Sequence, residues 1–329
     1  MRPALIEAVG YSPQTIEKVE RLLELLIEIA GHPYLAPRLC LHGGTALNVF
    51  HLPMPRLSVD ADLTYIGRVP LSEFETERPQ LESAMTNLGT SMGYRVTTSS
   101  KIEHSGRIYK LRYRYGDQSD LIKVDFVYLN RAPLLPAETA TCFACSPEVG
   151  VTTLALPELV AGKTKAMFDR LAIRDLYDIH RVQASGLPEQ MANGDADQYR
   201  LQRRIRIYYV SLSTRYPCPI DETIAEQFAQ RREDIEADLY PVLNVADRPA
   251  LEEMIENAGL FITSHVAPKE DEEKEYLRLL DEESYYEPGL LFSPWPTVLK
   301  QAVTSPAALW KVQNLRNRPA SPPNKYPEW

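Results

Sequence analysis

The sequence has little of what marks several protein classes. Four cysteines in 329 residues are too few for a disulfide scaffold. No apolar run approaches the ~20 residues that a membrane helix needs. The first residues, MRPALIEAVGYSPQTIEKVE, carry acids and lack an apolar signal core, so we expect a cytoplasmic location.

An excess of basic residues is also missing. The chain has 36 Lys and Arg against 45 Asp and Glu, which gives a net charge of −9 and a pI of about 5.3. An electrostatic nucleic-acid binder is usually basic, so the average charge argues weakly against one. An acidic protein can still bind RNA through one basic face, and arginines do concentrate in DQYRLQRRIRIYY, from Arg200 to Arg206.

The cysteines include one CxxC pair, Cys142 and Cys145. Such a pair fits a zinc or redox site. No second CxxC or CxxH accompanies it, which favours plain reduced thiols.

Length and patterning predict two domains, residues 1–150 and 151–329, with a Pro-rich stretch at Arg131–Pro147 as the candidate boundary. The spacing of apolar residues predicts mixed helices and strands before it and helices after it. Expected helices are Ile16–Ala30, Thr45–Phe50, Leu71–Met92, Glu158–Leu171, Arg174–Ala184, Gln198–Leu212, Glu222–Ala237 and Arg248–Ala258. Expected strands are Pro37–Leu41, Val59–Tyr65, Tyr94–Ser99, Arg107–Tyr115 and Leu121–Leu129.

These elements indicate an α+β fold, because the later strands lack intervening helices. We expect a small mixed sheet with flanking helices, followed by a mostly α-helical domain. The tail from Pro319, PASPPNKYPEW, is Pro-rich and is expected to pack poorly.

The segment LHGGTALNVFHLPMPRLSVDADL places two glycines and a threonine, Gly43, Gly44 and Thr45, before a short helix. Glycines let backbone N–H groups approach a ligand, and a helix N-terminus favours an anion, so this turn suits a phosphate. A tight strand-to-helix turn without a ligand is the alternative.

Three carboxylates on strands suit a hard cation such as Mg²⁺. Asp60 and Asp62 are two residues apart, so both side chains project to one side of their strand. Asp125 interrupts the apolar strand LIKVDFVYL, where a carboxylate costs several kcal/mol unless it is paired or bound to metal. The alternatives are solvated surface acids for the pair and an edge-strand acid for Asp125.

A later segment, ELVAGKTKAMFDRLAIRDLYDIHRV, combines cations and acids at helical spacing. Lys163 and Arg170 share one helix face, and Asp175 and Asp178 lie three residues apart on the next helix. A structural network of interhelical salt bridges is the alternative to a functional site here.

Together these motifs resemble nucleotidyltransferases of the polymerase-β type. More narrowly, GGTAL, RLSVDADL and GKTKAMFDRLAIRDLYDI are similar to the AbiEii/AbiGii family of toxin nucleotidyltransferases, which includes the MenT toxins. The resemblance covers Leu41 to Arg181 and leaves the C-terminal third unassigned.

The resemblance implies a role for each motif residue. The Gly-rich turn, with Arg56, would hold a nucleoside triphosphate, and Asp60, Asp62 and Asp125 would hold metal, expected as two Mg²⁺ ions. Asp125 would also act as general base. The resemblance implies that Lys163 contacts phosphate, with Lys165 as a substitute, and that Asp175 and Asp178 orient that lysine or the nucleotide. Ser58 would share the face of Asp60, where phosphorylation would repel the triphosphate.

The resemblance further implies the toxin half of a toxin–antitoxin pair, which adds nucleotides to the 3′ end of tRNA and blocks translation. The Arg200–Arg206 face would then hold the acceptor stem, unless it is only a solvated helix face. The acidic segment Lys269–Glu283 would meet a basic partner, hypothetically a winged-helix antitoxin. The alternatives are transfer to a protein hydroxyl or to a small molecule such as an antibiotic, and a non-catalytic nucleotide-binding protein.

Overall fold

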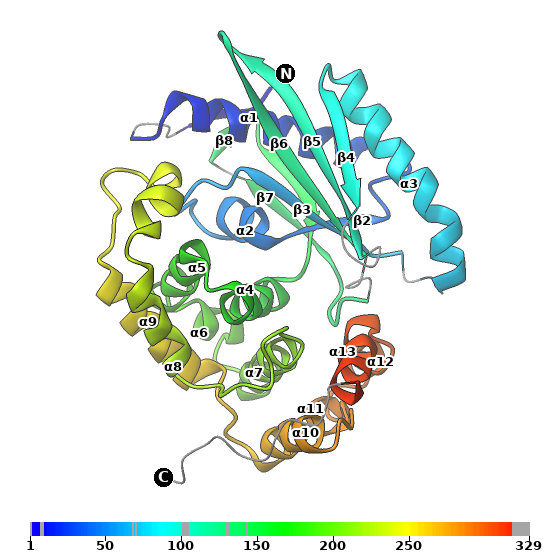
Figure 1. Ribbon diagram of the computed structural model, residues 1–329, viewed down its shortest axis with the longest axis vertical. Coiled ribbons are helices and arrows are strands. Elements are labelled where there is room, and N and C mark those ends of the chain that lie inside the picture. Colours follow the sequence, from blue (N-terminus) through cyan, green and yellow to red (C-terminus); the bar gives the residue numbers. More distant parts are fainter. Residues whose placement is uncertain are drawn as a thin grey trace.

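A seven-stranded mixed sheet organises the first half of the chain (Figure 1). The computed structural model describes residues 2–6, 10–67, 69, 71–100, 105–128, 132–142 and 144–317. The strand order is β4-β5-β6-β3-β2-β9-β7. The strands are β2 (Leu39–His42), β3 (Asp60–Tyr65), β4 (Arg95–Ser100), β5 (Gly106–Tyr115), β6 (Gln118–Val127), β7 (Glu138–Cys142) and β9 (Val149–Thr153). A separate two-stranded sheet pairs β1 (Ala4–Leu5) with β8 (Cys145–Ser146).

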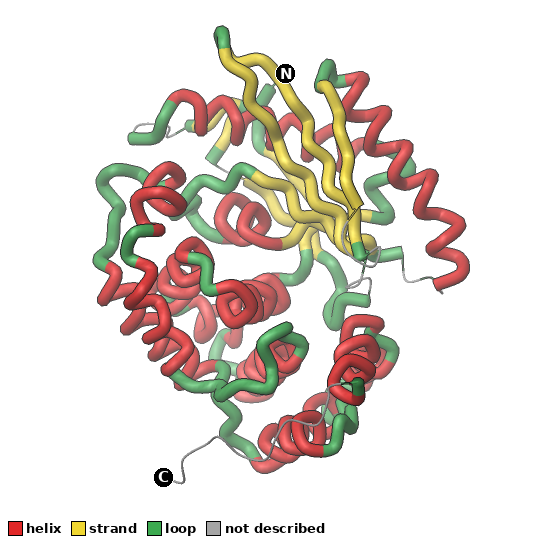
Figure 2. Tube along the Cα trace, in the orientation of Figure 1, coloured by secondary structure: helices red, strands yellow, loops and turns green. Residues whose placement is uncertain are grey.

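Helices cover the sheet and then form a region of their own, as the tube in Figure 2 shows. The first are α1 (Pro13–Gly31), α2 (Gly43–Thr45) with a π-helical turn at Ala46–His51, and α3 (Leu71–Ser91). The later ones are α4 (Leu156–Arg170), α5 (Ile173–Ala184), α6 (Leu187–Ala192), α7 (Ala196–Ser211), α8 (Thr223–Glu226), α9 (Leu251–His265), α10 (Asp271–Glu282), α11 (Gly289–Phe292), α12 (Pro296–Val303) and α13 (Pro306–Arg316). The predicted α+β fold with a helical second part is confirmed. No helix among the described residues is long and apolar enough to cross a membrane.

One face of the sheet is buried beneath α1 and α3. Helix α1 begins at the N-cap Ser12, whose side chain accepts from the Thr15 N–H, and Pro13 occupies its first turn. Its apolar face, including Leu22 and Leu26, is buried in the core. The aromatic and aliphatic side chains on this side of β5 and β6, such as Tyr109 and Val124, are also fully buried. This packing fixes which side of every central strand faces outward.

The Pro-rich stretch contains strands that the sequence pattern did not reveal. Strand β7 lies within it, and β9, just after it, pairs parallel with β2 through Leu41 and Thr153. Strand β7 is a short edge strand, and both strands are only five residues long and lie close to prolines, so neither gives a long alternating pattern. The division into 1–150 and 151–329 stays a prediction. Cys142 and Cys145 are buried free thiols, and burial raises the pKa of Cys145 to about 12.

The helical part also differs in detail. Residues 222–237 form no single helix: α8 leads into a 3₁₀ segment at Gln227–Arg231 and a π-helical turn at Ile235–Leu239. No proline or glycine marks these interruptions, so nothing in the local pattern predicts them. The Pro-rich tail from Pro319 lies outside the described residues.

The arginine cluster of α7 is internal, and the prediction of a phosphate-binding face there is wrong for most of it. Arg203, Arg204 and Arg206 are buried, while only Arg200 is partly exposed. Arg203 and Arg204 bind Glu270 and Glu273 in an ion-pair network that joins α7 to α10. The acidic segment thus neutralises the chain's own arginines.

This network predicts a stability effect. Glu273 is fully buried, and its Oε1 lies 2.8 Å from Nη2 of Arg203. Replacing Glu273 by Ala leaves buried cations without their partner, so we expect a loss of about 3–5 kcal/mol in the free energy of unfolding. Denaturant titration measures it. The matched control is Glu272→Ala, whose carboxylate is 59% exposed and 3.7 Å from Arg204, and which should cost under about 1 kcal/mol.

Candidate active site

Charged side chains pack closely against the glycine turn, Gly43 and Gly44. Gly43 has φ +73, and a Cβ there would lie 2.3 Å from Oδ2 of Asp62. A Cβ on Gly44 would lie 2.8 Å from Nη2 of Arg56, 3.2 Å from Oγ of Ser58 and 3.4 Å from Nζ of Lys163. Glycine is therefore needed at both positions, by conformation at the first and by close approach at the second.

The predicted carboxylates share one side of the sheet. Asp60 and Asp62 are half-buried neighbours on one face of β3. Asp62 is in register with Asp125 on the parallel strand β6, and Asp60 is in register with Lys123. Residues in register point to the same face, so the three acids form one group across two strands. Asp125 is 8% exposed, and its Oδ2 lies 3.4 Å from Nζ of Lys123.

The acid pair has the electrostatics of a cation site. Burial and the neighbouring charge of Asp62 raise the pKa of Asp60 above its ordinary value. Both acids line a cavity of 320 Å³. No cluster of three His, Cys, Asp or Glu within the described ranges is close enough to hold a metal ion by itself. Two carboxylates nevertheless fit Mg²⁺, because magnesium sites commonly use one or two carboxylates completed by substrate phosphates.

A buried ion network lies against the turn. Arg56 donates two hydrogen bonds to Asp178, at 2.7 and 2.8 Å. Nζ of Lys163 lies 2.7 Å from Asp178 and 3.2 Å from Asp175. Burial opposes the charge of Asp178, but Arg56 and Lys163 outweigh it and hold the pKa of that carboxyl far below its usual range. The charged network is thus fully formed within the protein itself.

Three residues of this site were not among the predicted site residues. Asn48, fully buried on the π-helical turn, donates to Gly44 O and to Asp178, both at 3.0 Å. Arg170 binds Asp175 in bidentate fashion at 2.6 and 2.9 Å, yet its side chain is 61% exposed and lines the cavity. Arg174 lines the cavity too, and its Nε donates to the Asp238 carbonyl. The cations of the segment ELVAGKTKAMFDRLAIRDLYDIHRV signalled both arginines, whereas nothing in the sequence singled out Asn48.

The remaining predicted residues fall in two groups. Gly44, Arg56, Ser58, Lys163 and Asp175 line the cavity with the acid pair. Thr45 is buried beneath the site. Its Oγ1 lies 2.8 Å from Oγ of Ser58 and donates a hydrogen bond to the Asp60 carbonyl. Lys165 pairs with Asp169, and it is not among the residues that line the cavity. Of the two lysines, Lys163 is therefore the one at the site.

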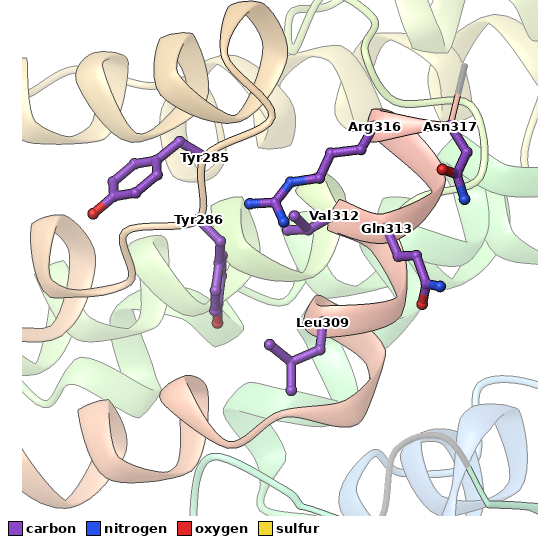
Figure 3. Close-up of a pocket in the computed structure, with 7 residues that line it drawn as sticks. All are labelled: Tyr285, Tyr286, Leu309, Val312, Gln313, Arg316 and Asn317. Atoms are coloured by element: carbon purple, nitrogen blue, oxygen red, sulfur yellow. The ribbon is translucent and has the colours of Figure 1, made fainter. Parts of the chain in front are cut away.

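Three larger cavities among the described residues lack this chemistry. One of 540 Å³ lies between Tyr285, Tyr286 and helix α13, and Arg316 is the single charged residue among the described residues that line it (Figure 3). Another, of 1210 Å³, is lined mainly by apolar residues of the segment between Val49 and Pro55. A third, of 670 Å³, is lined by Arg200 and Arg204 together with Glu270 and Glu272, but these charges already pair with one another within the protein. Size alone would therefore select the wrong place.

The fold and the site define a nucleotidyltransferase. The family model for the nucleotidyl transferase AbiEii toxin, of a type IV toxin–antitoxin system, matches residues 24–264. The chain belongs to this family of toxin–antitoxin nucleotidyltransferases, as its motifs predicted. No curated protein matches.

One solved structure supports the fold, and a second matches over most of its length without adding to that support. MenT4, a nucleotidyltransferase toxin from Mycobacterium tuberculosis H37Rv, is 15% identical with a TM-score of 0.54, over 88% of this chain and 92% of that chain. JHP933 from Helicobacter pylori is 16% identical with a TM-score of 0.45, over 77% of this chain and 92% of its own.

Two isosteric substitutions should separate a ligand-binding acid from a structural one. Asp60 has a raised pKa in the folded state, so its contribution to stability is present at low pH and is lost as pH rises through that pKa. Asp60→Asn should therefore leave the free energy of unfolding at pH 7 unchanged or higher, while nucleotide transfer is lost.

Compared with Asp60, the expected pH dependence of stability is reversed for Asp178. Its pKa is lowered, so its contribution is present above the unfolded pKa of about 4 and is lost as pH falls. Asp178→Asn should cost about 3–5 kcal/mol at pH 7, because Arg56 and Lys163 are left buried without their counter-ion. Urea titrations at pH 7 and pH 4 measure both variants. Equal destabilisation of the two at pH 7 would contradict this assignment.

Proposed function

We propose that this protein is a Mg²⁺-dependent enzyme that transfers nucleotides from a nucleoside triphosphate to the 3′ end of tRNA. The observation that carries the proposal is one cavity lined by charges of both signs. Asp60 and Asp62 reach it from β3, and the cations Lys163, Arg170 and Arg174 reach it from α4 and α5. A metal–triphosphate complex carries both signs of charge and matches this arrangement.

The cations and the glycine turn would bind the triphosphate. The Gly44 backbone lies close to Arg56 and Lys163. Ion pairs with Asp178 fix the positions of both cations. Arg170 binds Asp175 through Nε and Nη2 while its side chain is 61% exposed, so it can contact phosphate without leaving its carboxylate. Preorganised cations of this kind stabilise charge that develops on the transferring phosphoryl group.

Asp60 and Asp62 would hold the metal, with Asp125 beside them. Bound Mg²⁺ would neutralise the triphosphate and stabilise the leaving pyrophosphate. Asp125 would accept the proton of the acceptor hydroxyl as that oxygen forms its bond to the α-phosphorus and the bond to the β-phosphate oxygen breaks. Its neighbour Lys123, whose Nζ lies 3.4 Å from Oδ2, would help hold the carboxylate in position.

The size of the site favours a macromolecular acceptor. The cavity of 320 Å³ is at the low end for a small-molecule site, and a triphosphate would fill much of it. The acceptor hydroxyl would then enter from outside, as the end of a larger molecule does. The resemblance to the MenT toxins supports tRNA as that molecule, ahead of a protein hydroxyl or an antibiotic.

Control of the toxin would act on the same cavity. Family membership implies an antitoxin partner. Ser58 lines the cavity, with Oγ 2.8 Å from Oγ1 of Thr45. A phosphate on Ser58 would bring negative charge to the place where the triphosphate binds, and would block it by repulsion.

The test incubates purified protein with total tRNA, Mg²⁺ and each labelled nucleoside triphosphate in turn. We expect label on tRNA from wild type, a loss of at least about 10³-fold in Asp60→Asn because a required ligand is gone, and no label when EDTA replaces Mg²⁺. Glu272→Ala serves as a surface control with full activity. Label on protein or drug and none on tRNA would contradict the proposed acceptor.

A further inference from the structure

Cations crowd the open face of β4, β5 and β6. Alternate residues of β5, namely Lys110, Arg112 and Arg114, are exposed, while Tyr109, Leu111 and Tyr113 between them are buried on the other face. Arg95 on β4 is exposed and pairs in register with Arg112. The β5–β6 hairpin that carries most of these residues projects away from the helical region (Figures 1 and 2).

The register places like charges directly opposite each other. Arg95 faces Arg112, and Lys110 faces Lys123 on β6. Like charges at directly opposed positions destabilise a sheet. Arg95, Lys110, Arg112 and Arg114 form no ion pair with any residue that the structure describes, in contrast to the arginines of α7. Among the described residues the fold thus leaves the repulsion of Arg95 and Arg112 uncompensated, whereas Lys123 is balanced in part by Asp125, 3.4 Å away.

The same register joins the cations to the active site. Lys110, Lys123 and Asp60 form one row across β5, β6 and β3, so they share a face. Two strand spacings of ~4.8 Å place Lys110 about 10 Å from Asp60. Among the described strand residues of this face on β4 to β6, the one acid is Asp125, at the catalytic end. Asp120 lies on the opposite face, where it pairs with Lys18.

We infer that this surface, the β4–β6 basic face, binds the phosphate backbone of the nucleic-acid acceptor and directs its 3′ end to Asp125. The inference rests on the proposed function and adds the surface that recognises its substrate. A polyanion would relieve the like-charge repulsion by neutralising both members of each pair. Hydroxyls at Thr97 and Ser99, in register with Lys110 and Ile108, supply neutral phosphate donors beside the cations.

An acidic protein acceptor fits this surface less well. The basic face exposes no large apolar side chain among its described residues that could serve as a protein anchor. Its aliphatic members, Ile108 on β5 and Leu121 and Val127 on β6, are all half-buried. Regular cations without such an anchor are typical of backbone recognition, in which affinity comes from phosphate contacts.

The test neutralises four cations together: Arg95→Gln, Lys110→Gln, Arg112→Gln and Arg114→Gln. All four side chains are exposed and no longer repel one another after the change, so the melting temperature should hold or rise. With tRNA as acceptor, we expect KM to rise about tenfold or more at unchanged kcat. The slope of log(kcat/KM) against log salt should flatten by ~0.7 for each lost phosphate contact.

The matched control removes four other cations, with Arg231→Gln, Arg232→Gln, Lys274→Gln and Arg278→Gln. These side chains are exposed and each pairs with a surface acid, so the net charge falls equally and tRNA kinetics should not change. Equal effects of the two quadruple variants, or no effect of the first, would overturn the inference and leave the proposed function intact.

A second measurement separates the two claims. Asp60→Asn, which should bind without turnover, is titrated with labelled tRNA at several salt concentrations, with and without the four substitutions on the basic face. Loss of most RNA affinity with those substitutions supports the inference even if tRNA proves not to be the acceptor in the transfer assay. RNA binding that persists, or an acidic protein that binds there in place of RNA, overturns it.

Discussion

The rest of the site depends on one buried carboxylate, Asp178 of α5. It holds Arg56 from the segment before β3 and Lys163 from α4, and its Oδ1 also accepts from Asn48 beside the glycine turn. The segment from Asn48 to Arg56 and helix α4, far apart in sequence, are therefore both fixed to one point on α5. A buried carboxylate is costly when unpaired, so the cations have little freedom to move while the chain is folded.

This anchoring separates two kinds of acid within one site. Asp178 and Asp175 are satisfied by the protein, and their pKa values are lowered. Asp60 keeps an unfavourable neighbour in Asp62, and its pKa is raised. Only the second kind gains from an added cation. The buried ion pairs of Asp175 and Asp178 thus fix the positions of the cations. The repulsion between Asp60 and Asp62 remains until a cationic ligand relieves it, and a carboxylate with a raised pKa is therefore a marker of a functional site.

The sequence predicted the parts of this arrangement that follow from local chemistry. Paired acids on a strand, glycines before a helix and cations at helical spacing each have a physical reason to recur, and they gave Asp60, Asp62, Gly43, Gly44 and Lys163. Choosing Lys163 over Lys165 needed the tertiary structure, because two residues on a helix point in different directions. Asn48, β7 and β9 escaped for the same reason: their roles are set by distant partners, and no local spacing encodes them.

The arginines of α7 show most plainly what the sequence alone could not predict. DQYRLQRRIRIYY is the most basic segment of the chain, yet α10 neutralises it with Glu270 and Glu273. The cations of β4 to β6 are less dense in the sequence, because apolar residues of the buried face alternate with them. They gather only when three strands come into register. A count along the chain therefore points to an internal network, whereas strand register points to the surface where an acidic protein can still bind a polyanion.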